Sequence, residues 1–176
     1  MAHPYNFATI LIVSLLSISF TLTSVKADLI DEICSKTENK EVCYYALKED
    51  PRSKGANLEG LMTITIDLSQ KNATFTCNLV SMLLKKAIDP KLTMRYASCL
   101  KNFNDANNNL EKLPDLLKSK DYYGMHTNAS AAIRDPFTCD NSFLEPPVEA
   151  PELKDASDKL RGLIDVILIL INFLQG

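Results

Sequence analysis

Four long stretches of this chain carry apolar residues at helical spacing, and this pattern restricts the fold more than any other feature. The first stretch covers residues 58–88 and combines two stripes: Met62, Ile66, Ala73 and Val80 in one, and Leu61, Leu68, Phe75 and Met82 in the other. The other stretches cover residues 96–117, 122–139 and 151–174. Strand-like alternation is missing, so the sequence predicts an all-α fold whose core is a four-helix bundle.

Prolines and polar turns separate these stretches. Asp89-Pro90 reads as a helix end followed by a new start, with Asp as the N-cap and Pro in the first position. Pro114 is expected to kink the second long helix or to shorten it near its end. The segment "KSKD" (118–121) reads as a turn, and "NSFLEPPVEAPELKD" (141–155) begins as a proline-rich connector. Short or medium links between long amphipathic helices favour an antiparallel arrangement.

The final apolar run, "VILILINFL" (166–174), could be taken for a membrane anchor. A lipid-anchor signal requires a polar spacer followed by an uninterrupted hydrophobic tail. Here Asp165 and Asn172 interrupt the tail. The run therefore predicts the buried last helix of the bundle.

The N-terminus has the features of a secretory leader. Residues 7–22 are uncharged and mostly apolar, and "TSVKA" follows, with Val25 and Ala27 at the small-residue positions of a cleavage site. A first transmembrane helix is the alternative, but the run is short for a bilayer span. We therefore predict a signal peptide over residues 1–27 and a mature domain over residues 28–176, with no membrane contact after cleavage.

Five cysteines lie in the mature part: Cys34, Cys43, Cys77, Cys99 and Cys139. A secreted chain passes through an oxidising compartment, where paired thiols become structural disulfides. A CxxC redox motif is absent, and the spacings do not cluster four ligands as zinc sites do. The nine-residue spacing makes Cys34 and Cys43 the natural local pair. Several other connectivities stay open, and the odd count leaves at least one thiol free or paired between molecules.

Other chemistry is sparse. Two sequons, "NAT" at Asn72 and "NAS" at Asn128, are candidate glycosylation sites of a secreted protein. The net charge of −3 argues against nucleic acid, which requires clustered basic surface. The mature part has one histidine, His126, and no placed nucleophile beside it, so no catalytic triad is predicted. Neither a metal nor a cofactor is expected, and Cys77 lies in a helical pattern typical of an inert thiol.

Four features in order give the mature chain a family resemblance. They are the Cys34–Cys43 spacing after the leader, "DPRSKGANLEGL", "SKDYYGMHTNASAAIRDPFTC", and the final apolar helix. Together they resemble the plant invertase and pectin methylesterase inhibitor family, particularly its plane-tree pollen allergen branch. The resemblance implies a helical hairpin over residues 28–54 and a four-helix bundle over residues 55–176.

The same resemblance implies a disulfide pattern and a location. The implied pairs are Cys34–Cys43, which closes the hairpin, and Cys99–Cys139, which ties the second bundle helix to the third, while Cys77 stays free. A protein of this kind is secreted to the cell wall, with the vacuole as the alternative.

The resemblance further implies an inhibitor rather than an enzyme. Members directed at pectin methylesterase lay the second and third bundle helices across the enzyme's substrate cleft. Members directed at invertase present Pro-Lys-Phe after an acidic residue at the start of the third helix. Here that place holds Asp121, Tyr122, Tyr123 and Gly124, so the acidic residue matches and Pro-Lys-Phe does not.

We therefore expect the partner to be pectin methylesterase, with invertase as the alternative. The candidate contacts are Tyr123 and His126, with Asn104, Asn108 and Asp121 beside them. Two further possibilities are a secreted helical protein without an enzyme target and a carrier of a small ligand.

Overall fold

The computed structural model describes residues 29–176, so the predicted signal peptide (residues 1–27) lies outside the described residues. Five helices make up most of the described chain: α3 (Leu58–Lys86), α4 (Pro90–Leu110), α5 (Leu113–Lys118), α6 (Tyr122–Asn141) and α7 (Pro151–Gln175). No strand occurs between residues 29 and 176, which confirms the predicted all-α class.

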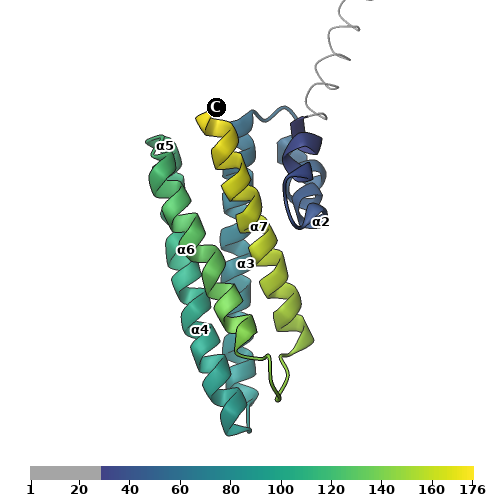
Figure 1. Ribbon diagram of the computed structural model, residues 1–176, viewed down its shortest axis with the longest axis vertical. Helices are drawn as coiled ribbons and strands as arrows, with labels where there is room; N and C mark the ends of the chain where they lie inside the picture. Colours follow the sequence, from purple (N-terminus) through teal and green to yellow (C-terminus); the bar gives the residue numbers. More distant parts are fainter. Residues whose placement is uncertain (1–28) are drawn as a thin grey trace, which may run out of the picture.

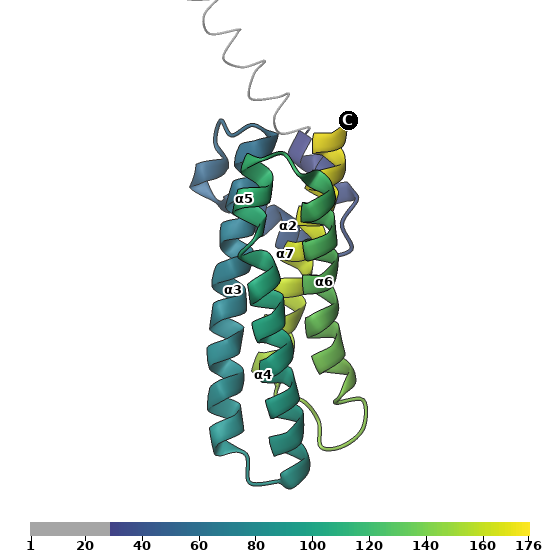
Figure 2. The same ribbon diagram turned by 90° about the vertical axis from the view of Figure 1, so that its left-hand side faces the viewer.

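Helices α3, α4, α6 and α7 form an antiparallel four-helix bundle, as predicted (Figures 1 and 2). α3 packs against α4 and α7, and α6 packs against the same two helices. α5 continues the line of α4 at the end of the bundle where α6 begins (Figure 2). The core is therefore shared by four helices, each of which offers one apolar face.

Side-chain caps determine where the bundle helices begin. At the start of α3, Oδ1 of Asn57 accepts a hydrogen bond from the backbone N–H of Gly60 at 2.8 Å. At the start of α4, Oδ1 of Asp89 accepts from the N–H of Lys91 at 2.7 Å, and Pro90 occupies the first turn. A proline loses nothing there, because the first N–H groups of a helix have no partner within it. The predicted Asp-Pro restart is confirmed.

Pro114 shortens the second bundle helix, which is one of the two outcomes that the sequence predicted. α4 ends at Leu110, and α5 begins at Leu113 with Pro114 in its first turn. Proline has no N–H, so the Leu110 carbonyl loses the donor that a continuous helix would supply. The side-chain amide of Gln70 in α3 donates to that carbonyl at 3.0 Å. A cross-helix hydrogen bond thus replaces a missing helical one.

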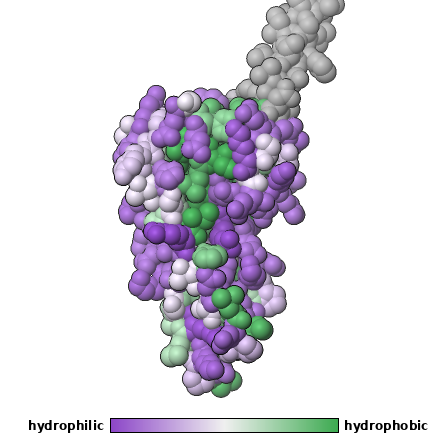
Figure 3. All heavy atoms as spheres, in the orientation of Figure 1, coloured by the Kyte–Doolittle hydropathy of each residue, from purple (hydrophilic) through white to green (hydrophobic). Residues whose placement is uncertain are grey.

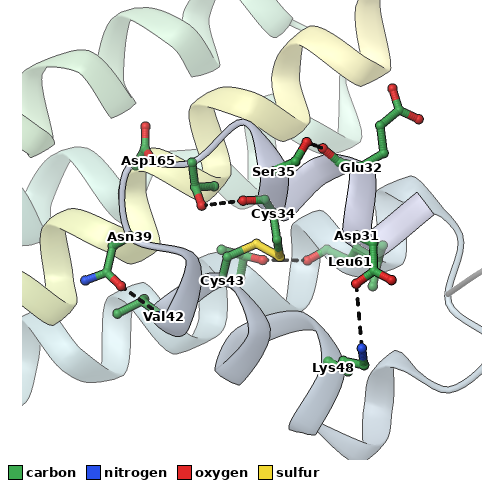
Figure 4. The surroundings of a disulfide bond; sticks show 12 residues. Asp31, Glu32, Cys34, Ser35, Asn39, Val42, Cys43, Lys48, Leu61 and Asp165 are labelled. Carbon is green, nitrogen blue, oxygen red and sulfur yellow. Dashed lines mark hydrogen bonds and ion pairs between the residues drawn. A yellow bond between two sulfur atoms is a disulfide. The ribbon is translucent and has the colours of Figure 1, made fainter. Parts of the chain in front are cut away.

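The two apolar stripes of α3 have different environments. The first is at most 2% exposed and lies in the core, as predicted: Met62, Ile66, Ala73 and Val80. In the second, Leu61 is 2% exposed, but Phe75 and Met82 are 59% and 52% exposed. Phe75 and Met82 each lie two positions after a core residue, Ala73 and Val80, and two positions correspond to about 200° of rotation around a helix, so this part of the second stripe points away from the core. Leu61 stays buried because the N-terminal segment lies over it (Figure 4).

That segment is the N-terminal hairpin, residues 29–53, which leans on α3 and α7 (Figure 1). It comprises helical residues 29–35, α2 (Lys40–Tyr44), the π-helical turn η1 (Tyr45–Glu49) and the 3-10 turn η2 (Pro51–Ser53). A disulfide joins Cys34 to Cys43, and both residues are fully buried (Figure 4). On the other side of the disulfide, Nζ of Lys48 lies 3.6 Å from the carboxylate of Asp31.

The hairpin contacts α7 through a small set of groups. The backbone N–H of Glu38 donates to Oδ2 of Asp165 at 3.0 Å. Gly162 faces Val42 so closely that a Cβ atom on Gly162 would lie 3.0 Å from the Val42 side chain. Lys36 lies over the ring of Phe173, with 4.5 Å between Nζ and the ring centroid. The hairpin is therefore fitted to one face of the last helix.

Helix α7 is the most apolar element of the bundle, and the prediction that it is a buried bundle helix is confirmed. Its inward side chains are fully buried: Leu153, Leu160, Leu163, Ile164, Val166, Ile167, Leu170 and Ile171. From residue 29 onward, no helix combines enough length and apolarity to cross a membrane.

Candidate functional site

The residues predicted to contact a partner are exposed, on α4 and around the start of α6. Tyr123 has 82% of its surface exposed, the highest value among the aromatic side chains exposed on the described surface. His126 lies one turn further along α6, and Asn104 and Asn108 project from α4. α4 and α6 are neighbours in the bundle, and of these residues Asn108 lines the groove between the two helices.

Asp121 has a structural task at this end of the face. Its Oδ1 accepts a hydrogen bond from the backbone N–H of Gly124 at 2.8 Å and so caps α6. A Cβ atom on Gly124 would lie 2.4 Å from Oδ2 of Asp121 and 2.9 Å from Cδ2 of Leu116 in α5. The start of α6 is therefore built around a glycine. Its conformation depends on the cap and on the packing of α5.

A polar groove of about 570 Å³ lies between α4 and α6. Asn108 lines it together with residues that the sequence interpretation missed, among them Lys112, Arg134 and Asp135. Arg134 is exposed on α6 eight positions beyond His126, which corresponds to about 12 Å along a helix axis. The structure therefore places Asn108 near Arg134, further along the face than Tyr123 and His126. Helical spacing could have found Arg134, which lies on the same outward side as Tyr123.

The electrostatics of this groove are mixed. Burial first, and then the charge of Asp105 on α4, raises the pKa of Asp135. Nζ of Lys101 lies 2.6 Å from Oδ2 of Asp105, so Asp105, one of these two carboxylates, is ion-paired with a lysine. A surface that offers both signs of charge and several amides suits hydrogen bonding to a polar protein surface.

The groove has rigid walls. A disulfide joins Cys99 of α4 to Cys139 of α6, with 4.8 Å between the Cα atoms, and both residues are fully buried. This confirms the pairing that the family resemblance implied. Ala129 and Ala132 are also fully buried on α6, so small side chains let the two helices approach closely. The face is preformed and would lose little conformational freedom on binding.

The opposite edge of α6 faces α7 and the hairpin. A groove of about 530 Å³ there is lined by Ile133, Arg161 and Asp165, and the hairpin residues 38–40 border it. An apolar strip runs over the upper half of the side seen in Figure 3, where α6 and α7 lie in Figure 1. Polar residues flank the strip on both sides in this view (Figure 3).

The remaining predicted modification sites lie within long helices. Asn72 is half-buried in α3, and its Oδ1 is buried without a hydrogen-bond partner. Asn128 is half-buried in α6, and its Nδ2, the atom that would carry a glycan, donates to the Gly124 carbonyl at 2.9 Å. A glycan at Asn128 would therefore require that side chain to turn outward. Glycosylation of both residues stays a prediction.

Cys77 has no disulfide partner in the described part of the chain and is half-buried on α3. Burial raises the pKa of its thiol, which keeps the thiol protonated and unreactive near neutrality.

The chain belongs to the plant invertase/pectin methylesterase inhibitor family, whose model matches residues 28–170. Proteins of this family inhibit enzymes and are not themselves catalytic. The chain is 39% identical to a pectinesterase inhibitor from Actinidia deliciosa, over 100% of this chain and 99% of the relative. A protein from Platanus orientalis named "Putative invertase inhibitor" is 28% identical, over 86% of this chain and 92% of its own length.

Solved structures agree with these relatives. A mutant form of a pectin methylesterase inhibitor from Arabidopsis superposes with a TM-score of 0.74 and 28% identity, covering 81% of this chain and 95% of that one. Both the predicted family and the resemblance to plane-tree proteins are confirmed.

Proposed function

We propose that this protein inhibits pectin methylesterase by laying the face formed by α4 and α6 across the enzyme's substrate cleft. The observation that carries the proposal is the start of α6, where invertase-directed members present Pro-Lys-Phe. In this chain a side chain at position 124 would collide with Asp121 and Leu116. A phenylalanine there would require the side chains of Asp121 and Leu116 to shift, so this end of α6 is not arranged for the invertase motif.

The similarities support the same target. The Actinidia relative at 39% identity and the superposed Arabidopsis structure are both named as inhibitors of this esterase. Invertase is the second candidate, because the Platanus relative carries an invertase inhibitor name. Action in the cell wall would agree with the predicted leader and with two disulfides, which persist in oxidising compartments.

The binding energy is expected to concentrate on a few side chains. Tyr123 offers a large exposed ring, and Arg134 offers a planar guanidinium beside a polar groove. Both residue types are frequent anchors in protein interfaces. Tyr123 would contact the enzyme near α5, and Arg134 and Asn108 would contact it further along the bundle.

The test is a titration of the mature protein, residues 28–176, against a plant pectin methylesterase and an acid invertase, with residual activity as the readout. We expect inhibition of the esterase, weakened about 30-fold by Tyr123→Ala, as for an anchor worth about 2 kcal/mol. Phe75→Ala is the matched control, because Phe75 is 59% exposed on α3, which is not a direct neighbour of α6. Inhibition of invertase alone would reverse the choice of target. Inhibition of neither enzyme would favour a secreted helical protein without an enzyme target, and fatty-acid uptake would indicate a carrier.

A further inference from the structure

The connector between α6 and α7 buries a carboxyl group beside another carboxyl group. Glu149 lies near the end of this connector, residues 142–150, and its Oε1 is buried without a hydrogen-bond partner. One carboxylate oxygen each of Glu149 and Asp140, together with Sγ of Cys139, lie within 4.8 Å of one another. The sulfur of Cys139 is bonded to Cys99, so this group offers no thiolate to a metal ion. It is a pair of carboxyl groups packed beside a disulfide.

Asp140 is the member of the pair that has hydrogen-bond and ion-pair partners. Its Oδ1 accepts a hydrogen bond from the hydroxyl of the fully buried Ser157 at 2.7 Å. Its Oδ2 lies 3.4 Å from Nη1 of Arg161 and 3.8 Å from Nζ of Lys154. Three polar groups of α7 thus surround the Asp140 carboxylate, one through a short hydrogen bond and two through ion pairs.

Glu149 has no comparable set of donors. The charged groups near it are Asp140 on α6 and the ion-paired Lys154 and Asp158 on α7. From α4, Tyr96 faces the same region, and its pKa is raised by burial and then by the charges of Glu149 and Glu152. Burial first, and then the charge of Asp140, raises the pKa of Glu149 to about 7. Lys154 opposes this shift, and Asp158 adds to it.

The first half of the connector is held by groups that keep one charge state across this pH range. Nη1 of Arg95 on α4 donates to the carbonyl of Glu145 at 2.8 Å and to the carbonyl of Pro147. The same guanidinium lies 5.4 Å from the ring centroid of Phe143. Ionisation near neutrality therefore acts on the end of the connector that carries Glu149.

We propose that Glu149 and Asp140 form a proton-dependent latch, which holds the end of the 142–150 connector against α6 and α7. With a proton on Glu149, the pair carries one negative charge, and the two neighbouring carboxyl groups do not repel each other. Without that proton, two carboxylates repel each other in a half-buried site, and Glu149 gains solvation by moving outward. The latch is closed in a mildly acidic medium and loosens above neutrality. It does not depend on which enzyme the protein inhibits.

The sign of the effect on stability follows from proton linkage. The pKa of Glu149 in the folded chain is above the ordinary glutamate value of 4.5. At a pH between these two pKa values the folded state binds more protons than the unfolded state, so the free energy of unfolding falls as the pH rises. The loss is complete once the pH has passed the folded-state pKa, at about 7.

Two measurements test the latch. A carboxyl ¹³C titration of the unaltered protein should give a midpoint near 7 for Glu149. A midpoint near the usual value of about 4.3 would overturn the proposal, and this test needs no variant. Second, hydrogen exchange of the amides of Leu153 and Lys154, which both donate to the carbonyl of Ala150, should be at least tenfold faster at about pH 8 than at about pH 5 after correction for the intrinsic chemical rate. Each unit by which the pKa of Glu149 is raised corresponds to about a factor of ten.

Variants separate the latch from general loosening of the connector. Glu149→Gln keeps the shape of the side chain and cannot ionise, so the protection of these amides should become independent of pH. Glu145→Gln is the matched control on the exposed part of the same connector and should retain the tenfold change. Equal pH dependence in the unaltered protein and in Glu149→Gln would contradict the proposal.

Discussion

The N-terminal hairpin and the four-helix bundle each contain one disulfide, but the two regions rely on it to different degrees. The bundle helices are 20 to 29 residues long and bury continuous apolar faces. In the hairpin, α2, η1 and η2 are at most five residues long, which is too short for stability in isolation. Cys34–Cys43 thus maintains a local fold, whereas Cys99–Cys139 fixes α4 against α6 in a region that is already helical.

The largest effect is expected from removal of the bundle disulfide. In the loop-entropy account, the sequence separation of 40 corresponds to a loss of about 4 kcal/mol in the free energy of unfolding. The double change Cys99→Ser and Cys139→Ser should lower the urea midpoint and loosen the face that α4 and α6 form, so inhibition should weaken as well. The measurement is urea unfolding followed by circular dichroism. An unchanged midpoint would mean that helix packing alone fixes α4 against α6.

The hairpin disulfide should matter less in energy and more locally. A separation of nine residues corresponds to about 3 kcal/mol in the same account. The double change Cys34→Ser and Cys43→Ser should increase hydrogen exchange in residues 29–53 and leave most of the helical signal of the bundle. Loss of all helical signal would show that the hairpin is part of the bundle's cooperative unit.

The docking of the hairpin can be weakened without touching either disulfide. Gly162→Leu would drive a side chain into Val42, because even a Cβ atom at this position lies 3.0 Å from it. We expect a loss of about 2 kcal/mol, typical of an overpacked contact, together with faster exchange in the hairpin. Val42→Ala in the same chain should restore part of the loss. If Gly162→Leu is as stable as the unaltered protein, this contact does not position the hairpin.

The smallest effect is expected at the ion pairs of Arg52, which join the end of the hairpin to α3. Its guanidinium lies 2.7 Å from Asp50 and 2.6 Å from Asp67, but the side chain is 46% exposed. Arg52→Gln should therefore cost only about 0.5 kcal/mol near neutrality, measured by urea unfolding. Lys101→Gln is the control, since its partner Asp105 lies in the same helix.

The pH dependence of this effect has a defined sign. The hydrogen bond from Arg52 lowers the pKa of Asp50, and hydrogen bonds from Lys71 and then Arg52 lower the pKa of Asp67. Both folded-state pKa values are therefore below the ordinary aspartate value of 3.8. The contribution is complete above that value and disappears as the pH falls through the folded-state pKa values. A difference between Arg52→Gln and the unaltered protein that grew in acid would contradict this assignment.

Features encoded over a few residues were predictable from the sequence. The Asp89-Pro90 restart is a capping signal that acts within one turn, and the core stripe through Met62 and Val80 follows from helical periodicity. The burial of Leu61 was not predictable from the second stripe, because it depends on the hairpin, which lies over Leu61 and not over Phe75. The position of Asn108 beside Arg134 depends on how α4 lies against α6, which no local signal determines.

The sequence by itself determined the helical class, the helix boundaries at caps and prolines, and the family to which the chain belongs. Only the tertiary structure decided that the hairpin covers α7 and part of α3, and that Glu149 lies beside Asp140. The physical reason is the range of the interactions. Caps and periodic stripes act between residues close in sequence, whereas burial and shared charge depend on which distant segment occupies the neighbouring space.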